Sequence, residues 1–333
     1  MMKAVQSFIG EPVAIVGAGL VGAGWAIAFA RAGLTTRVYD ANPSLSEKVL
    51  PWAAEQLSAL HAHGLLSEPP QVVANRLVRV NSLKEAVDDV AYVQESVLER
   101  LDVKRQLMED LDAIADADVI IGSSSSGIPA SAFANDLAIS PRVLIAHPVN
   151  PPHLVPVVEL VPSTQTSEDT VEFVDRLMVT IGQSVVHVRK EVEGFVLNRL
   201  QAALLREAWA LQRDGVASCE DIDKTVRDGL GWRWSFMGPF ETIDLNAPGG
   251  IADYANRLGA LYYSIARSRV DDGPWNAELI AQVEKDRRQH LCADDLAARR
   301  DWRDEKLMEF AARKSSITGQ SVSELDGSTG ASR

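Results

Sequence analysis

A histidine and a glutamate twelve residues apart are the side chains best suited to chemistry in this chain. His147 follows the apolar run 143–146, and Glu159 lies within the apolar run 155–161. Adjacent strands can bring such groups together, and an imidazole suits proton transfer because its ordinary pKa of about 6.5 lies near neutrality. Glu159 would fix the tautomer of the imidazole and offset the charge it acquires.

The alternative for any histidine is a structural role with its ring nitrogens merely hydrogen-bonded. That interpretation is kept for the remaining histidines, which are His61, His63, His153, His187 and His290.

Three glycines near the start of the chain form a second pattern suited to binding. Gly17, Gly19 and Gly22 follow the apolar run 13–16 and precede the helix-forming stretch 25–30. In this pattern the first glycine permits a tight turn, the second lets backbone N–H groups approach a pyrophosphate, and the third lets helix and strand pack closely. The phosphates then lie at a helix N-terminus. The pattern in this context predicts a dinucleotide site.

Asp40 ends the second expected strand, eighteen residues after Gly22. An acidic side chain there binds the adenosine ribose hydroxyls and repels a 2′-phosphate, so the sequence favours NAD over NADP. Leu20 and Val21, which begin the intervening helix, complete the predicted cofactor contacts of this turn.

Composition bounds the class of protein. The chain has 333 residues, 46% of them hydrophobic and 24% charged, which is enough for two domains with cores. No apolar run approaches the roughly 20 residues of a membrane span, and residues 1–5 begin no signal peptide, so we expect a cytoplasmic protein without a membrane partner.

Charge and cysteine content exclude further classes. The net charge of −13 argues against nucleic acid as a partner, although local positive pockets for an anionic substrate remain compatible with it. Cys219 and Cys292 are too few for a disulfide framework and are not spaced as metal ligands. We therefore expect a reducing compartment and no metal.

The expected elements alternate between strands and helices over residues 1–190. Further strands are expected at 91–93, 119–121 and 143–146, with extra ones at 155–161 and 185–188, and helices at 43–63, 102–115 and 167–181. This order predicts an α/β fold in which a Rossmann-type, doubly wound, mostly parallel sheet forms the NAD-binding domain.

Residues 191–314 carry helical patterns alone and predict a second, all-helical domain for substrate binding and dimerisation. One helix begins near Glu193, and its apolar positions are Phe195, Val196, Leu200, Leu204, Ala208 and Leu211. A helix apolar around so much of its circumference must be buried. It is nearly too hydrophobic for the surface of one monomer, so we expect a homodimer built through this domain.

Local signals delimit the other helices of that domain. Ser218 and Asp221 form a start similar to a capping box, and the glycines of 229–231 are a stop signal, so a helix is expected over 220–228. Helical patterns continue through 252–268 and 279–313, and residues 315–333 are expected to be a flexible tail.

The chain resembles the 3-hydroxyacyl-CoA dehydrogenase family over roughly residues 11 to 260, and within it the branch of lambda-crystallin and L-gulonate 3-dehydrogenase. The motifs that carry the resemblance are VAIVGAGLVGAGWA, QESVLERLDVK, IIGSSSSGIP, AHPVNPPHLVPVVELVP, EVEGFVLNRLQ and DGLGWRWSFMGPFETIDLNAPGG. The resemblance implies hydride transfer between C3 of a 3-hydroxy acid and the nicotinamide of NAD, with a His–Glu pair as acid and base.

The resemblance also implies roles for matching positions. His147 matches the family's base and Glu159 its partner. Ser125 best matches the serine that hydrogen-bonds the reacting oxygen, but the register in the serine run can slip by one, and Ser126 is the alternative. Asn198 matches the asparagine that helps to hold the reacting carbonyl. Without the resemblance, Asn198 would be interpreted as an amide at the start of a helix.

On the cofactor side, Glu99 and Lys104 match positions that meet the nicotinamide-side ribose, and Asn150 matches one beside the nicotinamide. Without the resemblance, Glu99 and Lys104 would be interpreted as a solvated pair at the start of a helix.

Two features of the sequence bear on the substrate: the lack of lysines that acyl-CoA members carry after the second strand, and Arg233. Acyl-CoA members carry lysines after the second strand, whereas residues 43–66 here hold one basic residue, Lys48, and no clamp for the phosphates of CoA. Arg233 lies in a stretch that resembles gulonate and carnitine dehydrogenases, and we expect its guanidinium to bind the C1 carboxylate in bidentate fashion. The flanking Trp232 and Trp234 are interpreted as core, or else as pocket walls that would suit the quaternary ammonium of carnitine.

Together these observations predict an NAD-dependent L-3-hydroxy-acid dehydrogenase that acts on a small anionic polyhydroxy acid, with oxidation of L-gulonate to 3-dehydro-L-gulonate favoured. The alternatives within the class are L-carnitine 3-dehydrogenase and a short-chain 3-hydroxyacyl-CoA dehydrogenase. Those outside it are a non-catalytic, crystallin-like structural protein and an NAD-sensing module.

Overall fold

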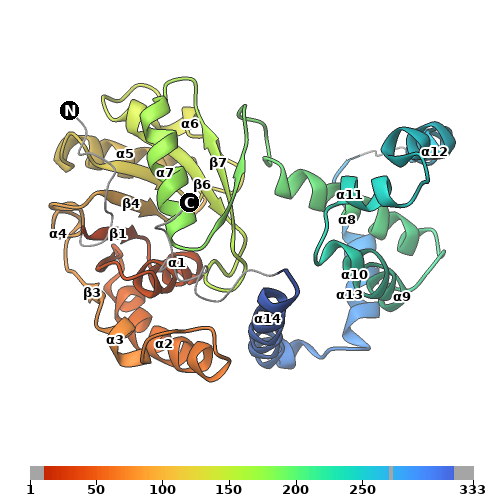
Figure 1. Ribbon diagram of the computed structural model, residues 1–333, viewed down its shortest axis with the longest axis horizontal. Helices are drawn as coiled ribbons and strands as arrows, with labels where there is room; N and C mark the ends of the chain where they lie inside the picture. Colours follow the sequence, from red (N-terminus) through yellow and green to blue (C-terminus); the bar gives the residue numbers. More distant parts are fainter. Residues whose placement is uncertain (1–10, 270–272, 319–333) are drawn as a thin grey trace. The chain divides into compact units, whose positions relative to one another are not determined.

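The computed structural model describes residues 11–269 and 273–318 (Figure 1). Contacts between residues divide the chain into two compact units. Unit 1 comprises the described residues of 1–200 and 302–333, and unit 2 comprises those of 201–301. The sequence-based division was different, since it placed residues 191–314 in one helical domain.

Unit 1 is built on an eight-stranded sheet in the order β3-β2-β1-β4-β5-β6-β7-β8. The strands are β1 (Val13–Val16), β2 (Thr36–Tyr39), β3 (Leu77–Arg79), β4 (Tyr92–Glu95), β5 (Ile120–Ser123), β6 (Val143–Pro148), β7 (Val157–Pro162) and β8 (Ser184–His187). All neighbouring pairs are parallel except β6 and β7, which are antiparallel. The expected Rossmann-type, mostly parallel sheet is confirmed; only the short β3 had no counterpart among the expected strands.

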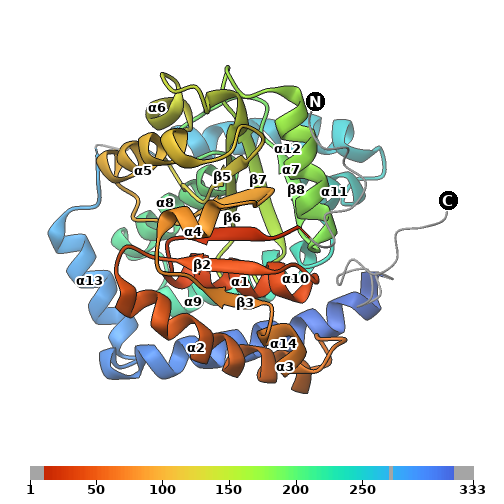
Figure 2. The ribbon, with the colours of Figure 1, turned by 90° about the vertical axis from the view of Figure 1, so that its left-hand side faces the viewer.

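Helices cover both faces of this sheet (Figures 1 and 2). They are α1 (Leu20–Arg31), α2 (Pro43–Ala62), α3 (Pro70–Ala74), α4 (Leu83–Val87), α5 (Leu101–Ile114), α6 (Ser131–Ala134), the 3₁₀ turn η1 (Ser140–Arg142) and α7 (Glu168–Thr180). Alternate residues of β1 enter two different cores, since Val13 and Ile15 pack with α1, α2 and α7 while Ala14 and Val16 pack with α4, α5 and α6. Each face of the sheet is therefore buried, as a doubly wound fold requires.

The C-terminal helix α14 (Leu296–Thr318) joins the first of these cores through Met308, which is buried. Figures 1 and 2 show this part of α14 beside α2. Ser315 to Thr318 continue the helix, although they were expected to begin a flexible tail; the rest of that tail, 319–333, lies outside the described residues.

Unit 2 is helical. It contains most of α8 (Leu197–Arg213), then α9 (Cys219–Lys224), the π-helical turn η2 (Thr225–Leu230), α10 (Gly231–Trp234), α11 (Pro239–Leu245), α12 (Gly250–Arg267), α13 (Ala277–Arg288) and the 3₁₀ turn η3 (Ala293–Asp295). Ser218 caps α9 by accepting the Asp221 N–H at 3.1 Å, so the predicted start is confirmed.

The predicted stop after residue 228 is wrong, because the chain continues through η2 directly into α10. Gly231 keeps a right-handed helical conformation, and a Cβ there would lie 2.9 Å from the carbonyl oxygen of Val226. The glycine thus accommodates the close backbone approach of the wide π turn rather than ending the helix.

Two burial predictions in the helical region are also wrong for the single chain. Leu200 of α8 is 62% exposed and Leu204 is 37% exposed, so the apolar face of α8 is not buried. Trp232 and Trp234 of α10 are likewise exposed rather than core. No described helix is long and apolar enough to cross a membrane.

Candidate active site

The glycine turn between β1 and α1 has the geometry that its pattern predicts. Gly17 adopts φ +104°, and a Cβ at this position would lie 2.4 Å from the backbone of Ser96. A Cβ at Gly22 would lie 1.9 Å from the carbonyl oxygen of Gly17. A Cβ at Gly19, in contrast, would meet no other group within 4 Å, so there is open space beside this glycine at the N-terminus of α1. A pyrophosphate fits such a place.

Asp40 ties the glycine turn to the end of β2. Its carboxylate accepts the Ala18 N–H and the Asn42 N–H, both at 2.7 Å. The acidic group predicted to meet the adenosine ribose is therefore held at the carboxyl edge of the sheet. Leu20 and Val21 lie in the first turn of α1, and Leu20 is exposed.

His147 and Glu159 are direct cross-strand neighbours in the antiparallel β6–β7 pair. His147 Nδ1 lies 2.7 Å from Glu159 Oε2, and both side chains are buried. With Nδ1–H donating to this carboxylate, Nε2 carries the lone pair and can accept a proton. The predicted acid–base geometry is thus present in unit 1.

The other oxygen of Glu159 holds the chain at the start of α8. Oε1 accepts the Val196 and Leu197 N–H groups, each at 2.9 Å. Burial raises the pKa of Glu159, but the hydrogen bond from His147 and the two amides outweigh it, and the net pKa is lowered. Glu159 is therefore an ionised partner for His147 at neutral pH.

The serine run forms the loop after β5, and its members differ in what their hydroxyls do. The Ser125 hydroxyl is buried and lies 2.8 Å from Glu99 Oε1 and 2.7 Å from the Ile128 carbonyl oxygen. Ser126 is only partly buried, and its carbonyl oxygen accepts the Asn198 Nδ2–H at 2.8 Å. Ser126 and Asn198 are thereby brought together. The Ser126 hydroxyl donates only a long hydrogen bond, at 3.4 Å, to the Glu99 oxygen that the Ser125 hydroxyl contacts at 2.8 Å.

Glu99 organises the same loop from its outer side. Its Oε1 accepts the Ser126 N–H at 2.8 Å and the Gly127 N–H at 3.0 Å. Burial raises the pKa of Glu99, but Lys104, Ser125 and these amides lower it by more. Glu99 and Lys104 are not the solvated pair of the alternative interpretation, because Lys104 is buried and lies 3.3 Å from Glu99.

The sequence analysis missed Glu95, the last residue of β4. Its carboxylate is fully buried and accepts two hydrogen bonds from Lys104 Nζ, each at 2.9 Å. A signal was present, since an acidic residue ends an apolar strand nine residues before the only lysine of the following helix.

The remaining predicted residues lie apart from this cluster or in the other unit. Asn150 is exposed in the loop after β6. Arg233 is partly buried on α10 of unit 2, between Trp232 and Trp234.

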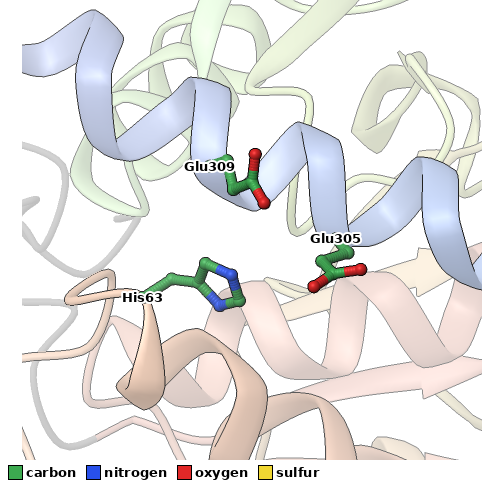
Figure 3. Close-up of side chains that lie close together, drawn as sticks. All are labelled: His63, Glu305 and Glu309. Atoms are coloured by element: carbon green, nitrogen blue, oxygen red, sulfur yellow. The ribbon is translucent and has the colours of Figure 1, made fainter.

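One group of potential metal ligands occurs within residues 11–269 and 273–318. His63, Glu305 and Glu309 have ligand atoms within 4.8 Å of one another (Figure 3). His63 Nδ1 lies 2.9 Å from the Ala59 carbonyl oxygen, and Glu309 accepts Lys306 Nζ at 2.6 Å. The Lys306 ammonium already pairs with the Glu309 carboxylate. We therefore interpret these three side chains as part of the surface formed by α2 and α14 and not as a metal site.

Comparisons with known proteins extend over both units. Residues 12–192 match the family described as 3-hydroxyacyl-CoA dehydrogenase, NAD binding domain, and residues 194–283 match 3-hydroxyacyl-CoA dehydrogenase, C-terminal domain.

Individual relatives agree with this match. The chain is 39% identical over 312 residues to lambda-crystallin of Oryctolagus cuniculus, across 92% of this chain and 98% of that protein. It is 38% identical over 248 residues to L-carnitine dehydrogenase of Streptomyces griseus, across 74% of this chain and 73% of that protein. A solved structure of 5-formyl-3-hydroxy-2-methylpyridine 4-carboxylic acid 5-dehydrogenase, an NAD⁺ dependent dismutase, superimposes with a TM-score of 0.78 at 25% identity, across 93% of this chain and 99% of that one.

Proposed function

Since the chain belongs to the 3-hydroxyacyl-CoA dehydrogenase family, we propose that it oxidises the C3 hydroxyl of a small polyhydroxy acid, with L-gulonate as the substrate and 3-dehydro-L-gulonate as the product. The family makes it an NAD-dependent oxidoreductase that acts on CH–OH groups. NAD supplies the hydride acceptor, and the open space at Gly19 and the placement of Asp40 fit this cofactor. Glu99 and Asn150 are proposed to contact the nicotinamide side of NAD, and the buried Lys104, predicted there with them, is proposed to act through Glu99.

The observation that carries the proposal is the hydrogen bond between His147 and Glu159 at 2.7 Å. His147 Nε2 accepts the proton of the C3 hydroxyl as the hydride leaves C3, and the ionised Glu159 stabilises the imidazolium that forms. Glu159 also fixes the orientation of the ring, because its two oxygens are held by His147 on one side and by the start of α8 on the other.

For the group that hydrogen-bonds the developing carbonyl, we favour Ser126 over Ser125. The Ser125 hydroxyl already has three hydrogen-bond contacts, with Glu99, with the Ile128 carbonyl oxygen and with the Ile128 N–H at 3.1 Å. The Ser126 hydroxyl has one, to Glu99 at 3.4 Å. Ser126 is more accessible and is bonded to Asn198, whose amide keeps a second N–H for the substrate oxygen. Ser126 and Asn198 together therefore polarise C3.

The substrate assignment is supported by the composition of α2 and by Arg233. Lys48 is the only lysine or arginine of α2, which leaves that helix without a clamp for CoA phosphates. A guanidinium pairs with a carboxylate in bidentate fashion, so Arg233 is assigned to the C1 carboxylate of a free acid.

A second candidate substrate is L-carnitine. It is favoured by the identity of 38% to an L-carnitine dehydrogenase and by the exposure of Trp232 and Trp234 beside Arg233. Exposed aromatic faces attract a quaternary ammonium group, whereas gulonate offers none.

A homodimer is the proposed assembly. The helical region leaves large apolar side chains exposed in the single chain, among them Leu200 and Leu204 on α8 and Trp232, Phe240 and Leu245 further along. Exposed apolar side chains in such number favour association with a second copy of the chain.

The proposal is tested by NADH formation with L-gulonate, L-carnitine and 3-hydroxybutyryl-CoA in parallel, using wild type and His147→Gln. We expect gulonate turnover in the wild type, and a loss of roughly 10²- to 10⁴-fold in kcat for His147→Gln with NAD affinity retained. His61→Gln, which changes an exposed histidine, is the matched control and should keep full activity. Retained turnover in His147→Gln would refute the assigned base, and inactivity of the wild type on all three compounds would refute the substrate class.

A further inference from the structure

Glu95 is a fully buried carboxylate at the carboxyl edge of the sheet. It ends β4, where its register partners are Val16 at the end of β1 and Ser123 at the end of β5. Glu95 therefore lies at the sheet edge from which the glycine turn after β1 and the serine loop after β5 begin.

Four hydrogen bonds satisfy this carboxylate. Lys104 Nζ donates to both oxygens at 2.9 Å, the Val97 N–H donates to Oε1 at 2.7 Å, and the Ser123 hydroxyl donates to Oε2. Ser123 Oγ in turn accepts the Ser125 N–H at 3.2 Å. One route from Glu95 to the serine loop thus runs through Ser123.

A second route runs through Lys104. Its ammonium contacts Glu99 Oε2 at 3.3 Å as well as Glu95, and Glu99 receives the Ser126 and Gly127 amides. The carbonyl oxygen of Ser126 is then bonded to Asn198. A single chain of contacts therefore connects the end of β4, the first turns of α5, the serine loop and the start of α8.

The buried charges of Glu95 and Lys104 make the stability of each side chain depend on the other. A lone carboxylate or ammonium inside a protein is strongly unfavourable, so Glu95 and Lys104 each depend on the other. Lys104 is less than 2% exposed and cannot reach solvent as the structure stands. Without Glu95, Glu99 would be the only carboxylate left to Lys104, so the position of Glu99 at the loop amides depends on Glu95 through Lys104.

We propose that Glu95 is a positioning residue of the dehydrogenase reaction, which holds Lys104 and Ser123 so that Glu99 sets the loop carrying Ser126 beside Asn198. This inference rests on the proposed function for its kinetic consequence. Its structural consequence, an ordered serine loop, does not require a known substrate.

The test compares Glu95→Gln with the double variant Glu95→Gln, Lys104→Met. The single variant leaves a buried ammonium facing an amide and should lower stability. The double variant removes both charges, and replacing a buried ion pair by uncharged groups of similar volume is often close to neutral, so stability should return near wild type. In both variants the carbonyl oxygen of the introduced amide can accept the Val97 N–H, while its NH2 group takes the place of Oε2 and can donate to the Ser123 hydroxyl oxygen.

Three measurements are made on the full chain: thermal unfolding, backbone amide hydrogen exchange across residues 123–128, and kcat at saturating NAD with the NAD dissociation constant measured separately. In the double variant we expect faster exchange at the Ser126 and Gly127 amides and a kcat roughly 10- to 100-fold below wild type, despite recovered stability. The proposal is overturned if kcat and exchange recover together with stability, because the pair would then serve folding alone.

The matched control is Glu68→Gln, which removes a carboxylate paired with Arg76 at 2.6 and 2.7 Å at a place remote from the loop. It should change neither exchange in 123–128 nor kcat. If the wild type turns over none of the substrates, the proposed function fails, while loop exchange still decides whether Glu95 orders the loop; wild-type exchange in both Glu95 variants overturns the positioning role.

Discussion

Neighbouring serines whose hydroxyls differ in the number and length of their hydrogen bonds give the sharpest test at the scale of single residues. Ser126→Ala should lower kcat by roughly 10²-fold, the usual cost of losing one donor to a developing oxyanion, while leaving thermal stability near wild type. Ser125→Ala removes a hydroxyl bonded to Glu99 and Ile128, so its first effect should be on stability. The two variants are compared by kcat and by the melting temperature. A larger kcat loss in Ser125→Ala at unchanged stability would reverse the register.

His153 predicts a pH dependence of stability. It is buried beside Trp52, with its ring 5.5 Å from the indole, and neither ring nitrogen has a hydrogen-bond partner among the described residues. Burial, followed by the charges of Arg31 and Arg303, lowers its pKa to about 3.

The sign follows from which state binds the proton. Between about pH 6.5 and 3 the unfolded chain protonates His153 and the folded chain does not, so stability falls as the pH falls through this window. His153→Phe should remove up to about 1.4 kcal/mol of that loss per pH unit, measured by urea unfolding at pH 7, 5 and 4. His61→Gln should keep the wild-type slope; an unchanged slope in His153→Phe would show that His153 does not titrate in this way.

At the scale of elements, the glycine turn separates packing from cofactor binding. Gly19→Ala adds a methyl group into open space, so we expect unchanged stability and NAD affinity weakened by at least about tenfold, because the methyl occupies room needed by the pyrophosphate. Gly22→Ala, whose Cβ would lie 1.9 Å from Gly17, should lower both. Melting temperature and NAD titration by fluorescence provide the two readouts.

Gly259→Ala is the matched control, since its Cβ also meets nothing within 4 Å but lies on α12. It should leave NAD affinity unchanged. Wild-type affinity in Gly19→Ala would contradict the assignment of this turn to the pyrophosphate.

Elements also show how far sequence patterns extend. The alternation of strands and helices, the capping residue Ser218 and the strand–glycine–helix opening are local signals, and the structure confirms the elements that they predicted. The stop expected at residues 229–231 failed because glycine serves two purposes: it ends helices, and it admits close backbone contacts such as that between Gly231 and Val226. Sequence alone does not separate the two.

At the scale of the whole molecule, the exposed apolar side chains of the helical region predict assembly. Leu204→Glu should yield monomers in light scattering where the wild type gives dimers, because a charge cannot be buried at an apolar contact without a partner. Leu45→Glu on α2 is the matched control, since both leucines are 37% exposed. A wild-type monomer, or a dimer that survives Leu204→Glu and similar changes along α8, would contradict this interface.

Some residues of the candidate site could be predicted from local sequence, whereas others could be found only from contacts between distant parts of the chain. His147 and Glu159 were foreseeable because a short connection joins the two apolar strands that carry them, so antiparallel pairing can place them opposite each other. Glu95 was missed because its partners Lys104 and Ser123 come from a helix and another strand, and only burial shows that these three groups must satisfy one another. The choice between Ser125 and Ser126 depended on the same kind of contact.

The amino-acid sequence by itself determined the fold class, the family, the NAD-binding turn and the identity of the residues that could perform acid–base chemistry, because these follow from short-range periodicity and motifs. Only the tertiary structure decided which of these groups meet, which are buried and which hydroxyl is already occupied. The physical reason is that desolvation and hydrogen-bond partnership depend on all the elements packed around a side chain. Those partners are distant in sequence, as Ser123 is from Glu95 and Asn198 is from Ser126.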